Sequence, residues 1–475
     1  MPSLDNLVKQ RLENGPIIAK GLATDSTGRE YFERHMFVKS KQYVKDFLTN
    51  KSDIRWLIMI GLRGVGKSTI MAQTYLELIR NGVEKEDILY FSVDQIEVAG
   101  FTLNEVLEAF ETIKGVSLEG LRNRTFILID ETQTDSNWGK ILKAVFDKNK
   151  KIFIFCTGSS ALELQANPDI ARRSKLEKLY PLSFVEYQLI KNRIFPKKGL
   201  KNKLREALYY SDSAEECFTR LEVLKNEVDE YWSQVDQTQV EHYFEIGTLP
   251  FTATYTDTMT AYNQINGLID RIINNDLVAI KRFDPETLKK IKQIALYLSD
   301  KDVVSIVKLA QDIKMHPITV TGVMDALVQA ELIIKVPPQG SSTAKARKPA
   351  KFLFMTPNIR AALIKVYSIK VDPLDFKGCL MEDIAALHFY REFVNPGTGI
   401  LTYEAAENRA DFILTPQRSK PIAIEVGSGD KGTAQARNTA NDRGCKYGLT
   451  INKDRLSICD DLLVVSVPHS YFLLA

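Results

Sequence analysis

Residues 56–68 read Trp56-Leu57-Ile58-Met59-Ile60-Gly61-Leu62-Arg63-Gly64-Val65-Gly66-Lys67-Ser68, an apolar run followed by Gly, four residues and Gly-Lys-Ser. This is the spacing of a phosphate-binding loop, and its context fits because a strand-like run precedes it and a helix-patterned segment follows. The glycines let backbone N–H groups close around a polyphosphate, and the helix N-terminus adds a favourable dipole. The stretch therefore predicts a nucleotide site at the end of a buried strand.

Each part of this loop has an expected role. Lys67 is expected to reach the outer phosphates and to act in catalysis, and Ser68 is expected to offer its hydroxyl to Mg²⁺. A glycine-rich turn that matches by chance is the weaker reading, because the flanking strand and helix are both present. The expected nucleotide contacts are Gly61, Gly64, Val65, Gly66, Lys67, Ser68 and Thr69.

A second apolar run, 126–129, ends in the adjacent carboxylates Asp130 and Glu131. Ligands bind at the carboxyl edge of parallel sheets, so this pair is expected to face the phosphate loop. Asp130 would hold Mg²⁺ through water, and Glu131 would orient or deprotonate the attacking water, because phosphoryl transfer asks the protein mainly for positioning and charge stabilisation. A plain strand end is the structural alternative.

A third run, 152–156, ends in the hydroxyl residues Thr157 and Ser159. Either one suits a polar sensor between the loop lysine and the acidic pair, and capping of the next helix is the alternative. Arg172 and Arg173 follow, where a guanidinium could reach the terminal phosphate of its own or a neighbouring subunit's nucleotide. A surface role is equally open for each arginine.

The composition indicates a chain of several domains, with 475 residues, 44% of them hydrophobic and 26% charged. The net charge of +3 gives no global electrostatic reason for nucleic acid or membrane binding. No signal-peptide pattern and no apolar run near the ~20 residues that span a bilayer are present, so a cytoplasmic protein without a membrane partner is expected. The five cysteines lack CxxC spacing, which argues against a zinc cluster or disulfide framework.

Residues 286–355 predict a winged helix, with helices near 286–298, 305–313 and 319–329 and a hairpin from 332–336 and 352–355. Eight basic residues and no acidic one lie between Leu332 and Lys370, which indicates a local basic patch. Such a patch would give salt-sensitive, sequence-independent affinity for DNA, while protein contact is the alternative. The expected phosphate contacts are Lys345, Arg347, Lys348 and Lys351.

The C-terminal segment offers a second candidate site. Glu382 lies in a helical pattern, and Asp411 and Glu425 lie at two apolar strands, so the three carboxylates could share one or two Mg²⁺ ions for phosphodiester hydrolysis.

Further motifs accompany the phosphate loop: Asp130-Glu131-Thr132-Gln133 with Trp138, Thr157-Gly158-Ser159-Ser160, Pro181-Leu182-Ser183-Phe184 with Glu186, and Gly247-Thr248-Leu249-Pro250. With these motifs the chain resembles the archaeal-type AAA ATPases near the STAND group, which carry a winged helix and a C-terminal PD-(D/E)xK-fold domain. The resemblance implies ATP rather than GTP, and Asn452-Lys453-Asp454 lacks the Asn-Lys-x-Asp spacing of a guanine reader.

One position departs from the pattern of this resemblance. PD-(D/E)xK nucleases need a lysine two residues after the second carboxylate, and Gly427 stands there. Lys431 or Gln435 could reach inward from the next turn or helix, but an inactive, structural nuclease fold is favoured.

The resemblance implies an α/β architecture in which a P-loop NTPase sheet and a helical lid precede a winged helix and a mixed α/β restriction-endonuclease-like domain. The first functional hypothesis is a Mg²⁺-dependent ATPase whose cycle controls DNA-related C-terminal domains in a mobile-element or defence setting. The alternative is a nucleotide-controlled protein-interaction scaffold with an inactive nuclease-like domain. Assembly into a homo-oligomer fits either. The expected divisions are 1–50 (N-terminal extension), 51–190 (ATPase core), 191–285 (lid), 286–370 (winged helix) and 371–475 (nuclease-like).

Overall fold

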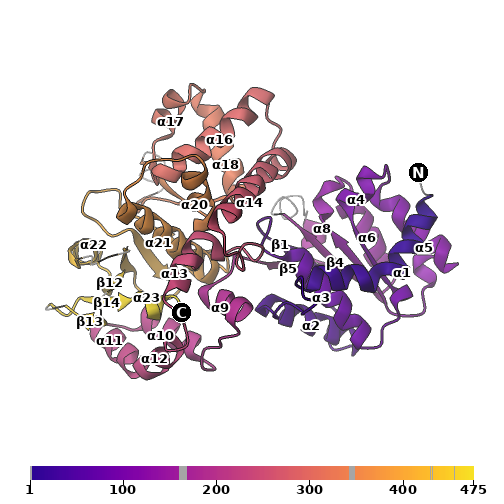
Figure 1. Ribbon diagram of the computed structural model, residues 1–475, viewed down its shortest axis with the longest axis horizontal. Helices are drawn as coiled ribbons and strands as arrows, with labels where there is room; N and C mark the ends of the chain where they lie inside the picture. Colours follow the sequence, from indigo (N-terminus) through magenta and orange to yellow (C-terminus); the bar gives the residue numbers. More distant parts are fainter. Residues whose placement is uncertain are drawn as a thin grey trace. The chain divides into compact units, whose positions relative to one another are not determined.

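A computed structural model describes residues 3–159, 168–341, 348–427, 429, 432–453, 455–459 and 461–475. The chain divides into two compact units (Figure 1). The first consists of Met1–Tyr180 and Asn275–Arg282, and the second of Pro181–Asn274 and Phe283–Ala475. The short segment 275–282 therefore belongs to the unit that contains the phosphate loop, although the residues on either side of it belong to the other unit.

The first unit is built on a five-stranded parallel sheet in the order β2-β3-β4-β1-β5. Every residue of β1, β3 and β4 is buried, as expected of a parallel sheet with both faces covered. The order brings the carboxyl ends of β1, β4 and β3 together at one edge, so the predicted α/β parallel-sheet fold is confirmed. The strands are β1 (Trp56–Ile60), β2 (Ile88–Ser92), β3 (Thr125–Asp130), β4 (Ile152–Gly158) and β5 (Lys175–Lys178).

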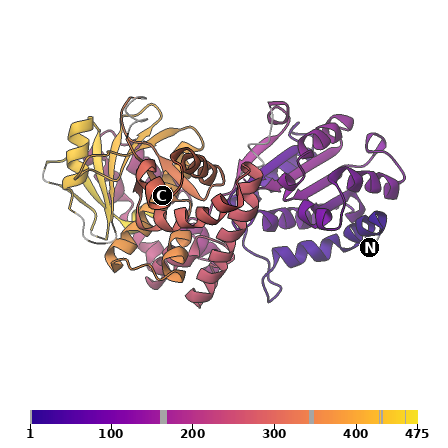
Figure 2. The same cartoon turned by 90° about the horizontal axis from the view of Figure 1, so that it is seen from above.

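The N-terminal helices belong to the core of this unit rather than to a separate extension. Val8 and Leu12 of α1 (Leu4–Ala23) share one apolar cluster with strand residues such as Trp56. A Cβ added at Gly15 would lie 2.4 Å from the Tyr75 hydroxyl oxygen, so α1 packs very closely on α3. Both α1 and α2 contact α3, and Figure 2 shows the two as indigo helices beside the purple strands. The other helices of this unit are α2 (His35–Leu48), α3 (Lys67–Arg80), α4 (Val93–Val98), α5 (Leu103–Lys114), α6 (Trp138–Lys148), α8 (Pro168–Ala171) and α15 (Leu277–Ile280).

The second unit begins with helices, in agreement with the helical pattern of the sequence. Helix α9 (Phe184–Asn192) starts at a capping box in which the Ser183 hydroxyl accepts from the Glu186 N–H and the Glu186 carboxylate accepts from the Ser183 N–H. The helices that follow are α10 (Leu200–Tyr210), α11 (Ala214–Val223), α12 (Lys225–Trp232), α13 (Thr238–His242), η4 (Tyr243–Gly247) and α14 (Thr258–Arg271).

Three helices and a small antiparallel sheet follow, in the part of the chain where the sequence predicts a winged helix. The helices are α16 (Pro285–Asp300), α17 (Ile306–Asp312) and α18 (Pro317–Gln329). The sheet has the order β6-β8-β7, from β6 (Val303–Val304), β7 (Ile333–Val336) and β8 (Ala350–Phe354).

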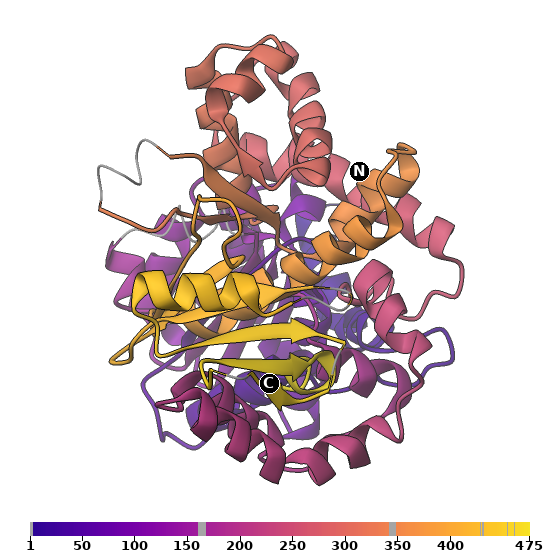
Figure 3. The same ribbon diagram turned by 90° about the vertical axis from the view of Figure 1, so that its left-hand side faces the viewer.

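The C-terminal part carries a six-stranded mixed sheet in the order β13-β14-β12-β11-β10-β9. Strands β9, β10 and β11 run antiparallel, whereas β11, β12 and β14 run parallel. Helix α22 contacts β11 and β12, and Figure 3 shows it in yellow along the strands. The elements are α20 (Pro357–Val366), α21 (Pro373–Phe389), η6 (Tyr390–Val394), β9 (Gly399–Thr402), β10 (Phe412–Pro416), β11 (Ile422–Val426), α22 (Ala434–Arg443), β12 (Tyr447–Asn452), β13 (Ser457–Ile458), β14 (Val464–Pro468) and α23 (His469–Phe472).

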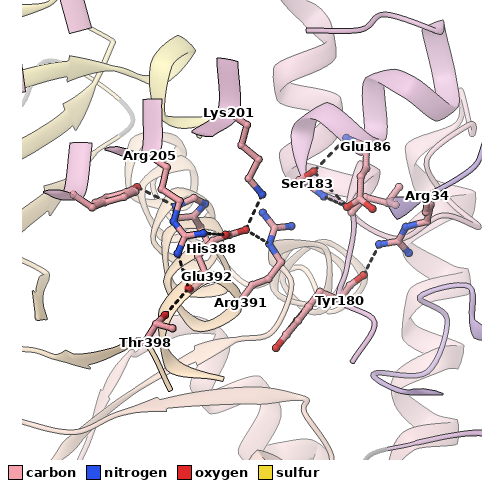
Figure 4. A network of polar contacts seen from close by, with 12 residues as sticks. Arg34, Tyr180, Ser183, Glu186, Lys201, Arg205, His388, Arg391, Glu392 and Thr398 are labelled. Carbon is pink, nitrogen blue, oxygen red and sulfur yellow. Dashed lines mark hydrogen bonds and ion pairs between the residues drawn. The ribbon is translucent and has the colours of Figure 1, made fainter. Parts of the chain in front are cut away.

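A charged network ties the helical part of this unit to its C-terminal part (Figure 4). The Glu392 carboxylate of η6 accepts from Lys201 Nζ at 2.8 Å and from Arg205 Nη1 at 3.0 Å, both on α10. Arg391 Nε lies 3.2 Å from the same carboxylate. Burial raises the pKa of Glu392, but Arg391 and the other cations outweigh it and bring the pKa to about 2. The network is therefore charged at neutral pH and fixes α10 against η6.

No helix in the described parts of the chain is both long and apolar enough to cross a lipid bilayer.

Candidate nucleotide-binding site

The phosphate loop joins β1 to α3, as the sequence predicts. Gly66 caps the helix with a φ of 97°, a conformation that glycine adopts without steric cost. A Cβ at Gly61 would lie 2.2 Å from the Leu179 carbonyl oxygen, so only glycine fits where β1 ends. Lys67 is buried, and its Nζ donates to the Gly61 and Leu62 carbonyls at 2.9 and 3.1 Å. The lysine is thus held over the loop that would surround the phosphates.

Asp130 lies at the carboxyl end of β3, close to the Ser68 hydroxyl of the phosphate loop and to Thr157, the predicted sensor. The Thr157 hydroxyl of β4 donates to Asp130 Oδ1. Burial raises the pKa of Asp130, the neighbouring Glu131 raises it further, and hydrogen bonds from Ser68 and Thr157 oppose the shift. A buried carboxylate beside a loop hydroxyl is an oxygen donor set that suits Mg²⁺, so these residues fit the ion that the sequence implies.

Glu131 follows directly in an unusual backbone conformation, with φ 50° and ψ 41°. A left-handed conformation costs a non-glycine residue on the order of 1–2 kcal/mol, and such strain is concentrated at functional sites. The side chain is positioned from within its own turn, because Gln133 Nε2 donates to Glu131 Oε2 at 2.6 Å.

A second group also holds Glu131. Arg63, one of the four variable residues of the phosphate loop, lies with Nη2 at 3.4 Å from Glu131 Oε2. The same guanidinium contacts both carboxylate oxygens of Asp276, at 3.0 and 3.2 Å. Asp276 is buried, and this burial raises its pKa although Arg63 opposes the shift. Arg63 therefore links the phosphate loop to Glu131 and to Asp276, which lies in the 275–282 segment of the first unit.

Arg34 stabilises the phosphate loop through hydrogen bonds to backbone carbonyls. Its Nη1 donates to the Val65 carbonyl at 2.7 Å, and its Nη2 donates to the Tyr180 carbonyl at 2.8 Å, as Figure 4 shows for the latter. The side chain is buried, so it stabilises the loop rather than contacting solvent.

The other expected nucleotide contacts have different surroundings. Arg172 pairs with Asp169, and Arg173 Nε lies 3.1 Å from Asp147 Oδ1, so both arginines are held by local carboxylates. Ser159 is buried, and its hydroxyl has no partner among the described residues. Thr69 is half-buried in the first turn of α3.

The basic patch predicted near the wing is smaller than the sequence suggests. Lys345 and Arg347 lie outside the described residues. Lys351 is buried in β8, with Nζ paired to Glu382 and 3.4 Å from Asp411 Oδ1, so its surroundings do not fit the expected phosphate contact. Arg360 is also buried, between Asp302 and Asp383, and Lys348 Nζ lies 4.0 Å from Glu404. The sequence could not show these pairs, because every acidic partner lies outside 332–370.

The structure brings the three C-terminal carboxylates into one region of the second unit. Asp411 Oδ2 accepts from the Val426 N–H at 2.9 Å, beside Glu425, and the Gln435 amide in its favoured orientation donates to both Glu425 oxygens at 2.6 and 2.9 Å. No three carboxylate, histidine or cysteine side chains in the described residues are placed to hold a metal ion. The Lys351 ammonium lies between Glu382 and Asp411.

A parallel sheet that presents a phosphate loop, an Asp-Glu pair and a sensor hydroxyl at one edge defines a P-loop nucleotide-binding domain of the ATPase type. Residues 53–188 match the family model described as "AAA domain". This part of the chain is an AAA-type P-loop ATPase domain.

Over 437 residues, the chain is 32% identical to a Methanocaldococcus jannaschii protein named "Uncharacterized protein MJ1637", across 91% of this chain and 87% of that protein. The chain belongs to the same family as this protein. A Haemophilus influenzae protein, also named as uncharacterized, is 25% identical over 156 residues, which cover 33% of this chain and 38% of that protein.

Solved structures give weaker likenesses. The Aeropyrum pernix ORC1 protein in complex with DNA is 11% identical with a TM-score of 0.33, covering 74% of this chain and 98% of that one. The Thermotoga maritima RuvB Holliday junction branch migration motor is 13% identical with a TM-score of 0.31, covering 74% and 99%. Scores of this size do not define a shared fold, and the AAA-type domain is defined by the family model over residues 53–188 and by the site.

Proposed function

We propose that this protein binds MgATP at the phosphate loop and hydrolyses it to ADP and phosphate. The observation that carries the proposal is the meeting of Lys67, Ser68, Asp130 and Thr157 at one sheet edge, with Glu131 held beside them. The AAA match supports ATP as the nucleotide.

The residues divide the chemistry among them. Mg²⁺, held by Ser68 and through water by Asp130, would neutralise charge on the β- and γ-phosphate oxygens. Glu131 orients a water whose oxygen forms a new bond to the γ-phosphorus, while the bond from that phosphorus to the bridging oxygen breaks and leaves with ADP. The water proton passes through Glu131 to solvent, so that ATP and water give ADP, phosphate and a proton. Lys67 stabilises the charge on the outer phosphates throughout.

Two substitutions test this proposal, one through MgATP binding and the other through turnover. Lys67→Ala is expected to abolish MgATP binding or to weaken it severely, because the ammonium that faces the phosphates is lost. Glu131→Gln is expected to bind MgATP normally but to retain it without turnover, as measured by calorimetry and by phosphate release. Unchanged turnover in Glu131→Gln would reject the water-positioning role.

For the second unit, we propose a nuclease-like fold that serves as a nucleotide-controlled interaction scaffold. Its elements run in the order helix, three antiparallel strands, helix and parallel strand, with the carboxylates on α21, at β10 and on β11, which suits a PD-(D/E)xK-like domain beside a winged helix. The placement of Lys351 between Glu382 and Asp411, together with Gly427 at the expected lysine position, favours this scaffold over a DNA-cutting enzyme. An ammonium in that place competes directly with a divalent cation.

A plasmid-nicking assay separates the two readings. The purified chain is expected to leave supercoiled plasmid intact in Mg²⁺ or Mn²⁺, and Asp411→Ala is expected to behave identically. Mg²⁺-dependent nicking that disappears in Asp411→Ala would instead support the DNA-cutting hypothesis.

A further inference from the structure

The hollow beside the catalytic carboxylates contains an arginine from the far N-terminal end of the chain. A cavity of about 640 Å³ lies elsewhere in the second unit, but a smaller one of about 250 Å³ opens on Ser68, Asp130 and Glu131. Arg11 of α1 lines this smaller cavity together with Gln95. Among the described residues that line it, Arg11 is the only basic one, whereas Asp94, Asp130 and Glu131 are acidic.

The position of Arg11 is fixed by its helix. The next residue, Leu12, is buried in the core of the first unit, and Gly15 one turn later meets Tyr75 of α3. Helix α3 is the one that begins at the phosphate loop, so α1 and the loop are parts of one packed body. The packed helix fixes the Arg11 backbone, and the hydrogen bond to Gln95 restrains the guanidinium, so that part of the ordering needed for charge stabilisation is present before a ligand binds.

The guanidinium is held by a neutral partner. Arg11 Nη2 donates to Gln95 Oε1 at 2.6 Å, and within the described chain no ion pair involves Arg11. A neutral amide can position a guanidinium without neutralising it, and the remaining N–H donors stay able to bind phosphate oxygens. Arg172 and Arg173, by contrast, are already paired with carboxylates.

We propose that Arg11 stabilises the transferring γ-phosphoryl group from within its own chain. This inference rests on the proposed ATPase function. It gives Arg11 the contact with the terminal phosphate that the sequence predicts for Arg172 or Arg173. Phosphoryl transfer gains from a guanidinium only as charge spreads over the γ-phosphate oxygens, so Arg11 contributes to the rate more than to the affinity for ATP.

The test compares Arg11→Ala and Arg11→Lys with Lys20→Ala, which removes an exposed basic residue from the same helix. In Arg11→Ala, single-turnover hydrolysis should fall by roughly 10³–10⁵-fold, while the MgATP dissociation constant should change by no more than about threefold. Arg11→Ala should also fail to retain ADP with aluminium fluoride, and added guanidinium should partly restore its rate. Arg11→Lys should be intermediate, and Lys20→Ala should match the wild type.

Several outcomes would overturn the proposal. Arg11→Ala that hydrolyses ATP and traps ADP–aluminium fluoride like the wild type would remove Arg11 from the reaction while leaving the ATPase proposal intact. Recovery of activity on mixing Arg11→Ala with Lys67→Ala would place the arginine's action between subunits instead. A wild-type chain that does not hydrolyse MgATP would overturn both proposals. If Arg11→Ala fails to fold, the intermediate rate and trapping of Arg11→Lys decide the question.

Discussion

Arg63 connects the phosphate loop to two carboxylates outside the loop. Its guanidinium is shared between Glu131 and Asp276, so the residue that orients water and the segment 275–282 are joined through one side chain. Asp276 is buried, and a buried carboxylate that loses its hydrogen-bonded counter-charge is destabilising. The ordering of 275–282 should therefore depend on Arg63.

Removal of this link has a local consequence. Arg63→Ala and Asp276→Asn are each expected to increase backbone hydrogen–deuterium exchange over 275–282, and the double variant should not add to the effect, because both changes break the same pair. The coupling should amount to about 1–2 kcal/mol, as typical for residues in direct contact.

A suitable control is Arg80→Ala, which removes an exposed ion pair to Glu30 and should leave exchange over 275–282 unchanged. Full additivity of the Arg63 and Asp276 variants would contradict the proposed link.

Helix α21 carries a histidine that is kept neutral by its surroundings. His388 Nε2 lies 3.0 Å from the Tyr209 hydroxyl of α10, and its ring packs against Phe472 at 5.0 Å between centroids. Burial lowers the pKa of His388 from 6.5 to about 3, although the nearby Glu392 opposes the shift. Arg391, Lys201 and Arg205 face the same region and disfavour a further positive charge.

This arrangement predicts a loss of stability in mild acid. Because the folded pKa lies below the unfolded one, the contribution of His388 is fully present above pH 6.5 and is lost as the pH falls toward 3. Well below pH 6.5 the loss should approach about 1.4 kcal/mol per pH unit, and His388→Gln should flatten the slope measured by urea unfolding between pH 6.5 and 5. His35→Gln, at an exposed position, should leave the slope as it is, and an equal slope in His388→Gln would refute the assignment.

Elements with a strong local pattern were predictable from the sequence, and contacts between distant elements were not. The phosphate loop, Asp130 and Thr157 are predictable from the sequence because each lies at the carboxyl end of a buried strand of a parallel sheet. Arg63 lies within the recognisable loop, but its partner Asp276 lies 213 residues away in the sequence. Helix α1 was likewise missed, although apolar residues at 8, 12, 15, 19 and 23 form a regular helical face that could have revealed it.

Folding of the second unit brings carboxylates from distant segments to basic residues that look unpaired in the sequence. The basic run at 332–370 looks uncompensated, but folding of the second unit pairs Lys351 with Glu382 and Asp411 and buries Arg360 against Asp302 and Asp383. Net charge over a stretch of sequence therefore does not show how many of its basic side chains are paired with carboxylates. Only the folded chain shows which cations are neutralised by carboxylates from other segments.

The account as a whole depends on a triphosphate bound between the loop and the acidic pair. The most direct measurement is a structure of the Glu131→Gln chain with MgATP, in which hydrolysis is blocked. The account predicts the triphosphate over the N-terminus of α3, with Lys67 on the outer phosphates, Mg²⁺ at Ser68, and the free N–H donors of Arg11 on the γ-phosphate. A loop that is empty in saturating MgATP, or nucleotide bound at another place, would contradict it.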